Sequence, residues 1–198
     1  MSGPRAQLPI FALQTVLFPG SMLPLKIFEQ RYMDMATDCL RHDSTFGVCL
    51  IAEGTEVGGP ATPHEIGVTA RIAGWDMEQL GVLKVTTRGE QRFRILDRES
   101  NRQGLLIARV DMLPAEAAHA VPKAMQPLIP LLRAIADDLG EERMPQPHAF
   151  GDASWVGYRY CEVLPISLIA RQKLLELDDS VMRLKIIFDF LSQRGLIG

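Results

Sequence analysis

The sequence predicts an α+β fold, in which a β-rich N-terminal part with one inserted helix is followed by an all-helical part. Up to about Leu113, short apolar runs alternate with polar residues and are separated by glycine, proline and other turn formers, which is typical of strands. Beyond 114–121, which we interpret as a linker, apolar residues recur only at helical spacing. We therefore expect a β-rich subdomain over 8–113 and a helical subdomain over 122–195, which together form one module.

The N-terminal residues form three short apolar runs. A Pro19-Gly20 pair, which favours a turn, separates the second run from the third. Pro24 lies inside the third run, and because proline cannot donate a hydrogen bond to a neighbouring strand, we expect this strand at a sheet edge or a bulge. The runs are Leu8–Leu13, Val16–Phe18 and Met22–Phe28.

After Phe28 the spacing of the apolar residues changes from that of a strand to that of a helix. The segment predicts one amphipathic helix of about three to four turns, which ends at Asp43-Ser44. A buried strand over 46–51 follows. The predicted apolar face of the helix consists of Phe28, Tyr32, Met35, Ala36, Cys39 and Leu40.

Three residues near the start of this helix carry specific expectations. Glu29 is expected in the first turn, where a carboxylate suits the helix dipole. Tyr32 is expected to be buried with its hydroxyl group hydrogen-bonded. Arg31, on the polar side, is expected to be tethered to an acidic or carbonyl partner near the domain junction.

Several segments resemble the N-terminal substrate-binding domain of Lon proteases. LPIFALQTVLFPG, LPL, IFE, RY and FGV occur in the order typical of that family, and EIGVTARI, GEQRFRI and ISLIARQKLLELDDSVMRL extend the resemblance over nearly the whole chain. The resemblance implies a PUA-like β pseudo-barrel followed by a helical end. It also implies a non-catalytic role in recognising unfolded or hydrophobic protein segments.

The remainder of the β-rich part reads as a loop followed by further strands. The loop over 53–66 is rich in glycine and proline. Gly89-Glu90 is expected to form a two-residue hairpin turn between two alternating segments. The expected strands cover 67–75, 80–88, 91–96 and 105–110.

Four helices are expected after the linker. The first carries a clean apolar face from Leu128 to Leu139 and is ended by Gly140. Asp152 and Ser167 are expected to cap the next two. The last helix follows Asp178-Asp179, and its apolar surface extends well past one stripe, so we expect it to pack between partners. The residues that widen this surface are Met182, Ile186 and Phe190.

Composition excludes several classes of protein. The net charge of −3 gives no basic field for nucleic acid or a membrane surface. No apolar run approaches the roughly 20 residues that span a bilayer, and the N-terminus carries no apolar signal segment. Cys39, Cys49 and Cys161 are odd in number and widely spaced, which predicts buried thiols in a reducing cytosol. The resemblance to the Lon-type module leads us to expect a cytoplasmic, bacterial protein.

Motifs for catalysis are absent from the sequence. There is no G-x-x-x-x-G-K-[ST] loop for nucleotide phosphates, no Ser-Lys motif resembling that of the Lon protease domain, and no histidine pair at a metal-ligand spacing. We therefore expect a stand-alone form without the ATPase and protease domains. No cofactor, no metal and no enzymatic activity are predicted.

Five residues are candidates for peptide binding. Phe18, Met22, Leu23 and Trp75 offer large, adaptable apolar surface that suits promiscuous recognition. Arg31 is a candidate for contact with a partner carboxylate. The alternatives are a place in the barrel core for each apolar residue, and for Arg31 an ion pair that fixes the helix.

A second candidate surface is basic. Arg92 and Arg94 share one strand face in a region rich in arginine, which suggests an anionic or RNA-binding patch. The alternative is a solvated face, because edge strands commonly carry charge that prevents pairing.

The sequence thus predicts a module that binds unfolded or hydrophobic polypeptides, with a protease or ATPase as a further partner and a role as an adaptor in protein quality control. Open strand edges would allow an extended peptide to add as a strand. The alternatives are an RNA-binding barrel and a small-molecule enzyme. Client identity and oligomeric state are left open.

Overall fold

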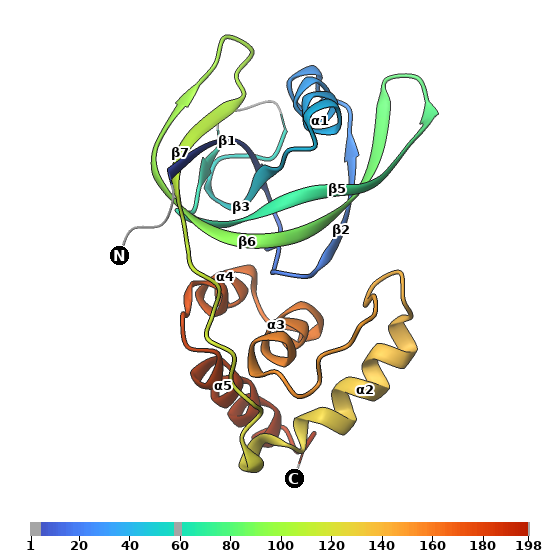
Figure 1. The fold of residues 1–198 in the computed structure, drawn as a ribbon, viewed down its shortest axis with the longest axis vertical. Coiled ribbons are helices and arrows are strands. Elements are labelled where there is room, and N and C mark those ends of the chain that lie inside the picture. Colours follow the sequence, from blue (N-terminus) through green and yellow to red (C-terminus); the bar gives the residue numbers. More distant parts are fainter. Residues whose placement is uncertain (1–4, 58–60, 198) are drawn as a thin grey trace. The chain divides into compact units, whose positions relative to one another are not determined.

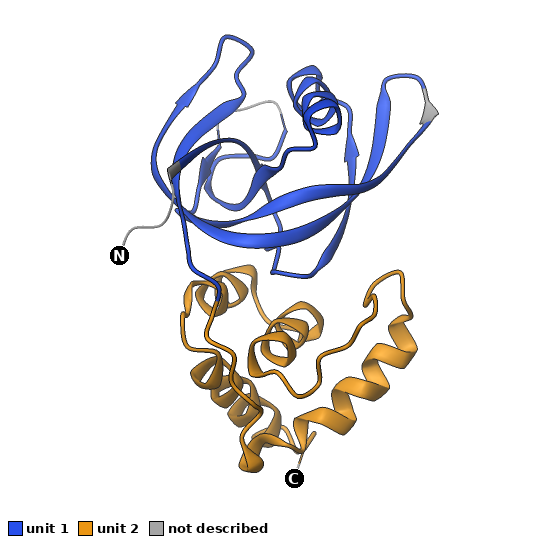
Figure 2. Ribbon diagram, in the orientation of Figure 1, with its two compact units in different colours: residues 1–115 blue, residues 116–198 orange. Residues whose placement is uncertain are grey.

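The computed structural model describes residues 5–57 and 61–197. The chain divides into two compact units, residues 1–115 and 116–198, and the division lies inside the segment that we interpreted as a linker (Figure 2). Strands dominate the first unit and helices make up the second (Figure 1). The predicted α+β class is confirmed.

Unit 1 is a strand ring with one helix. The sheet order is β1-β7-β6-β5-β3-β4, and an additional parallel pairing of β1 with β3 closes five of the strands into a ring. β2 and β4 lie outside this ring, paired with β6 and β3 respectively. The elements are β1 Arg5–Leu13, β2 Met22–Ile27, α1 Gln30–His42, β3 Phe46–Glu53, β4 Thr62–Pro63, β5 Ile66–Gln79, β6 Val82–Ser100 and β7 Leu106–Met112.

The interior of the ring is narrow and is filled around Phe93, which is fully buried. Two glycines make room for its ring. A Cβ atom on Gly47 would lie 2.6 Å from Phe93 Cζ, and one on Gly67 would lie 2.7 Å from the same atom and 2.5 Å from the Val48 carbonyl oxygen. The buried residues of this cluster are Leu8, Ile10, Cys49, Phe93, Ile95, Ala108 and Val110.

β2 is an edge strand, as Pro24 predicted. It pairs with β6 from Met22 opposite Arg88 to Ile27 opposite Leu83. Among the strands that the structure describes, no other pairs with β2. The missing proline N–H therefore removes no hydrogen bond from the interior of the sheet.

The predicted hairpin turn at Gly89-Glu90 is wrong, because β6 runs unbroken through both residues. The turn between β5 and β6 lies at Leu80-Gly81, where Gly81 has φ 84°. Gly89 instead allows the backbone at Phe18 to approach β6 closely, since a Cβ there would lie 2.3 Å from the Phe18 carbonyl oxygen. Its backbone accepts a hydrogen bond from Gly20 N (2.8 Å) and donates one to Ser21 O (2.9 Å).

The predicted helix is confirmed as α1, with corrections at its start. Phe28 precedes the helix and is 56% exposed, so its place on the apolar face was wrong. Glu29 occupies the N-cap position rather than the first turn. Asp43, in the left-handed region at φ 47°, ends the helix as expected. The side chains that α1 buries are Tyr32, Met35, Ala36 and Cys39.

Unit 2 confirms the four predicted helices and their caps. Asp152 Oδ1 accepts a hydrogen bond from Trp155 N (2.7 Å), and Ser167 Oγ accepts one from Ala170 N (3.2 Å). α3 is the central helix and contacts the other three. The elements are a 3-10 turn Lys123–Met125, α2 Leu128–Leu139, α3 Ala153–Val163, α4 Leu168–Glu176 and α5 Ser180–Ser192.

Glu116, which the sequence placed in a linker, anchors the start of unit 2. Its carboxylate receives two hydrogen bonds from the fully buried Arg183 guanidinium, at 2.5 and 2.9 Å. Ser154 and Tyr158 also donate to it through their hydroxyl groups. Arg183 further donates to the carbonyl oxygens of Leu174 (2.9 Å) and Leu177 (2.6 Å). This buried pair ties the first residues of the unit to α3 and α5.

The three cysteines are buried free thiols, and their predicted burial is confirmed. Burial raises the pKa of the Cys161 thiol to about 12, and it also raises the pKa values of Cys39 and Cys49. None of the three is therefore poised to react as a thiolate at neutral pH.

A methyl group at Gly67 should strain the ring interior. Gly67→Ala is expected to lower the free energy of unfolding by about 1–3 kcal/mol, because the core cannot expand around the new atom. Gly74, in the same strand, is the matched control, since no atom lies within 4 Å of a Cβ placed there. Gly74→Ala should change stability by no more than about 1 kcal/mol. Urea denaturation followed by circular dichroism compares the two, and equal midpoints would contradict the packing described.

Glu116→Gln should destabilise unit 2 by about 3–5 kcal/mol, because it leaves Arg183 buried without its counter-charge. Burial alone would raise the pKa of Glu116, but the hydrogen bonds from Arg183, Ser154 and Tyr158 outweigh burial and lower it. A carboxyl group whose folded pKa is lowered adds stability above its unfolded pKa, and this stability is lost as pH falls through the folded pKa.

Urea melts between neutral and acidic pH should show that acid-dependent loss in the parent and a smaller one in Glu116→Gln. The control is Asp189→Asn in the exposed Lys185–Asp189 pair, which should cost at most about 0.5 kcal/mol. A Glu116→Gln variant with the parent's stability would show that the buried pair is dispensable.

Candidate functional site

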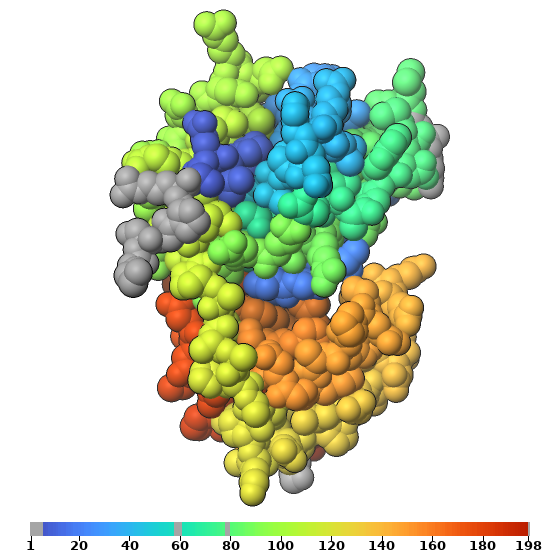
Figure 3. Space-filling model, in the orientation of Figure 1, coloured from blue at the N-terminus to red at the C-terminus, as the bar shows by residue number. Residues whose placement is uncertain are grey.

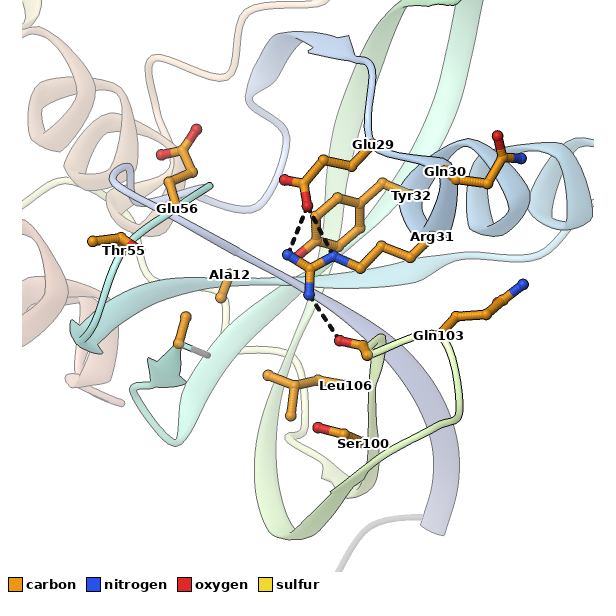
Figure 4. A pocket seen from close by; sticks show the side chains of 12 residues that line it. Ala12, Glu29, Gln30, Arg31, Tyr32, Thr55, Glu56, Ser100, Gln103 and Leu106 are labelled. Atoms are coloured by element: carbon orange, nitrogen blue, oxygen red, sulfur yellow. Dashed lines mark hydrogen bonds and ion pairs between the residues drawn. The ribbon is translucent and has the colours of Figure 1, made fainter. Parts of the chain in front are cut away.

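Two pockets of unit 1 contain residues that the sequence singled out. The first, the Arg31 pocket, has a volume of about 570 Å³ and lies between the end of β1, the start of α1 and two loops (Figure 4). Its side chains carry two carboxylates and one guanidinium group. The lining residues include Glu29, Gln30, Arg31, Tyr32, Thr55, Glu56, Ser100 and Gln103.

Arg31 is held within this pocket by its own chain. Its Nη2 lies 2.8 Å from Glu29 Oε2, its Nε donates to the same oxygen at 3.1 Å, and its Nη1 donates to Gly104 O at 2.8 Å. Figure 4 shows the guanidinium group between Glu29 and the loop of Gln103. The predicted tether to an acidic or carbonyl partner is confirmed, but both partners belong to unit 1, and nothing here bears on its expected place near the domain junction. An incoming carboxylate would have to compete with Glu29 for Arg31.

Tyr32 joins α1 to the ring. Its side chain stacks on Phe11 with ring centroids 3.9 Å apart, and the Arg31 guanidinium carbon lies 4.7 Å from its centroid. Tyr32 is buried as predicted, but among the described residues none hydrogen-bonds its hydroxyl group, so that part of the prediction was wrong. Burial raises the pKa of Tyr32; Arg31 opposes this, and Glu29 and Glu56 add to it.

The second pocket, the Trp75 groove, has a volume of about 640 Å³ and crosses three adjacent strands, β2, β6 and β5. Val85 pairs with Leu25 on one side and with Trp75 on the other, so the three side chains form one row across the sheet. Trp75 is 61% exposed. The groove is lined by Pro24, Leu25, Lys26, Gly74, Trp75, Asp76, Lys84, Val85 and Thr86.

A charged row occupies the neighbouring positions of these strands, where the side chains alternate to the other face of the sheet. Lys84 pairs in register with Lys26 and with Asp76, so the row carries two positive charges and one negative charge. Toward the turn of the β5–β6 hairpin, Met77 (46%) and Leu80 (96%) add further exposed apolar surface. In the space-filling view, this hairpin projects at the edge of unit 1 (Figure 3). The accessible apolar surface here therefore comes mainly from Trp75 and the hairpin, with Leu25 half-buried and Val85 buried beneath the row.

The structure separates the five candidate peptide-binding residues. Phe18 is fully buried and presents no surface to a peptide in this conformation. Met22 and Leu23 are half-buried on β2, next to the residues that line the Trp75 groove but outside it. Arg31 lies in its own pocket, and Trp75 alone of the five lines the groove.

Sequence reasoning missed Leu25 and Val85, the neighbours of Trp75 in the groove. The signal that predicts them is cross-strand register, which requires knowing that β6 pairs with β2 and β5 at once.

The two residues of the candidate basic patch, Arg92 and Arg94, differ in their exposure to solvent. Arg92 is 5% exposed, and only Arg94 presents its side chain to solvent.

Neither a metal-binding cluster of side chains nor a membrane-spanning helix occurs among the described residues. Within residues 5–57 and 61–197, no three histidine, cysteine, aspartate or glutamate side chains are grouped so that they could hold a metal ion. In the same part of the chain, no helix has the length and hydropathy to cross a bilayer.

Comparison with known proteins gives one consistent family. Residues 7–193 match the profile described as the ATP-dependent protease La (LON) substrate-binding domain. A Lon N-terminal domain protein from Xanthomonas campestris superposes with a TM-score of 0.78 at 33% identity, over 93% of this chain and 98% of that one. The N-terminal domain of the Mycobacterium avium complex Lon protease gives a TM-score of 0.66 at 20% identity over 94% and 98%, which shows the fold.

Cereblons are also similar to this chain in sequence. Protein cereblon of Danio rerio is 34% identical over 110 residues, which are 54% of this chain and 25% of cereblon. Protein cereblon of Gallus gallus is 28% identical over 117 residues, 58% and 25% of the two chains. The similarity therefore spans about a quarter of these longer relatives.

Substitutions at Tyr32 and Arg31 should separate packing from charge. Tyr32→Ala is expected to cost about 3–5 kcal/mol, because it removes a buried ring that stacks on Phe11. Tyr32→Phe, the matched control, keeps the ring and should cost far less. Arg31→Ala breaks a partly exposed ion pair and should cost about 0–1 kcal/mol. Thermal denaturation measures all three, and a Tyr32→Ala variant that melts like the parent would contradict the placement of α1.

Proposed function

Because this chain belongs to the LON substrate-binding domain family, we propose that it is a protein-binding module that recognises exposed hydrophobic segments of unfolded polypeptides. The observation that carries the proposal is the Trp75 groove, where a largely exposed tryptophan lies in one row with the half-buried Leu25 and the buried Val85. Exposed aromatic surface of this kind marks sites that bind other proteins.

The groove supplies enough apolar surface for useful but reversible binding. A tryptophan side chain buries up to about 250 Å², and Trp75 retains more than half of its surface for a partner. At about 25 cal/mol per Å², covering it contributes on the order of 3 kcal/mol before the costs of ordering are subtracted. A segment with one or two large apolar side chains is the client that this surface suits, because the large exposed side chain of the groove is the apolar ring of Trp75.

Side-chain burial suits the groove better than the addition of a strand to β2. The Leu23 carbonyl oxygen faces β6, where it accepts a hydrogen bond from the Thr87 hydroxyl group (3.0 Å). Backbone groups alternate along a strand, so those of Pro24 face the open edge, where proline has no N–H to offer. A peptide added at this edge would lack that hydrogen bond.

We propose a non-catalytic role for the chain. The chain acts by holding clients rather than by chemistry, as an adaptor for a protease or ATPase partner. We place it in the cytoplasm, because three buried free thiols suit a reducing compartment.

Trp75 can report on its own binding. In a Trp155→Phe background it is the only tryptophan, because the chain has two. Adding a permanently unfolded polypeptide, such as reduced and carboxymethylated lactalbumin, should shift its emission to the blue as the ring leaves water. Titration by fluorescence anisotropy of the labelled polypeptide should show that Trp75→Ala weakens binding at least about tenfold, which is about 1.4 kcal/mol.

The matched control is Phe28→Ala, which removes an aromatic ring of similar exposure (56% against 61%) that does not line the groove. It should leave the affinity unchanged. Binding should also persist in high salt, whereas binding to RNA would collapse through counterion uptake. Equal affinity of Trp75→Ala and the parent would contradict the proposal.

A further inference from the structure

The side chain of Tyr32 carries a polar group that the fold leaves without a partner. Tyr32 is 7% exposed, and among the described residues none hydrogen-bonds its hydroxyl group. Its oxygen is not one of the fully buried polar atoms that lack a partner, so part of that oxygen is accessible. Because Tyr32 lines the Arg31 pocket, the hydroxyl group opens into this cavity (Figure 4). A buried side chain with such a free polar tip points to a ligand that hydrogen-bonds it.

The charges that line this pocket do not balance. Arg31 and Glu29 neutralise each other, since Nη2 and Nε of the guanidinium group lie 2.8 and 3.1 Å from the same carboxylate oxygen, Oε2. Glu56 has no basic partner among the described residues, and its Oε2 accepts a hydrogen bond from a neutral donor, Gln14 N, at 2.7 Å. The described lining therefore keeps one uncompensated negative charge, which attracts a cation and repels an anion.

The Tyr32 hydroxyl group lies in the field of the same three charged residues. Burial is the main cause that raises the pKa of Tyr32; Arg31 opposes it, and Glu29 and Glu56 add to it. The phenol is therefore protonated at neutral pH, and its oxygen keeps lone pairs that accept hydrogen bonds. Oε1 of Glu29 and Oε1 of Glu56 are further acceptors, because the contacts with Arg31 and Gln14 are made by the Oε2 atoms.

We propose that the Arg31 pocket binds small aliphatic primary amines in their protonated form. An ammonium group has three N–H donors and no acceptor. The pocket matches it with the opposite chemistry, since the groups left free are the carboxylate of Glu56, one oxygen of Glu29 and the Tyr32 oxygen. The carbon chain of the amine meets the apolar part of the lining, which consists of Ala12, Ala61 and Leu106.

The positive groups beside the pocket are already compensated. Glu29 pairs with Arg31 and also occupies the N-cap position of α1, where its charge offsets the positive end of the helix dipole. The volume of about 570 Å³ lies in the range of small-molecule sites. Ser100 and Gln103 in the lining are exposed, so solvent screens the ion pair, and we expect a dissociation constant on the order of 1 mM. A site of this strength responds to abundant free amines and not to the lysines of a dilute polypeptide.

NMR titration of the nitrogen-15-labelled chain with n-butylamine at neutral pH tests the site. The amide signals of Gln14, Tyr32, Glu56 and Gly104 should shift in a saturable manner. Two matched ligands separate the parts of the interaction. Butyltrimethylammonium keeps the charge without N–H donors, and n-butanol keeps the chain without the charge. Each should bind at least about fivefold more weakly than n-butylamine, because each lacks the charge-assisted hydrogen bonds.

Isosteric substitutions test the two free groups. Glu56→Gln keeps the shape of the side chain and removes its charge, so it should weaken n-butylamine binding at least about tenfold. Tyr32→Phe removes only the hydroxyl group and should weaken binding about threefold. Glu142→Gln is the matched control, because Glu142 is an exposed carboxylate of unit 2 that does not line the pocket, and it should bind the amine like the parent.

Arg31→Ala gives an effect of opposite sign. It releases Glu29 from its ion pair and leaves two uncompensated carboxylates, so n-butylamine binding should tighten at least about twofold. A site built for carboxylates would instead lose its cation in this variant. Sodium butyrate, which keeps the alkyl chain but reverses the charge, should therefore give no saturable shift in the parent.

The absence of a saturable shift at tens of millimolar n-butylamine overturns the proposal. So does equal binding of n-butanol, or parent-like affinity in Glu56→Gln. Butyrate binding that Arg31→Ala abolishes would show an anion site instead. Titration with Nα-acetyl-lysine methylamide then identifies the source of the amine: saturable shifts of the same signals add lysine side chains to the ligands, and no shift restricts the site to free amines. Both of these last results keep the ammonium site.

Discussion

The closed ring of strands is the constraint on which the rest of unit 1 depends. Parallel pairing of β1 with β3 fixes a narrow interior, and Phe93 fits there because Gly47 and Gly67 face it. β6 is longer than the ring requires: residues 93–100 pair with β7 inside it, and 83–88 pair with β2 outside it. Gly89 lies between these stretches, where the chain before β2 crosses closely. The Trp75 groove is built entirely on the outer part.

Local chemistry made much of this structure predictable. The helices of unit 2 begin at Asp152, Ser167 and Asp179 because these side chains accept hydrogen bonds from first-turn N–H groups, a signal confined to a few residues. Signals that depend on distant partners were misread. In the sequence Gly89 looks like a turn residue, but in the structure it lies within β6 and allows the Phe18 backbone to approach closely. Glu116 looks like part of a linker, and its burial is evident only once Arg183 is placed beside it. Leu25 and Val85 join Trp75 through strand register alone.

Hydrogen–deuterium exchange of the parent, with and without an excess of unfolded polypeptide, tests the central claim most directly. The account predicts slower exchange in peptides from β2 and from residues 74–86, with unchanged exchange around the Arg31 pocket. The β5–β6 hairpin should respond most, because Trp75, Met77 and Leu80 expose apolar surface there. Protection confined to unit 2, or to the strands of the closed ring, would contradict the assignment of the Trp75 groove as the client site.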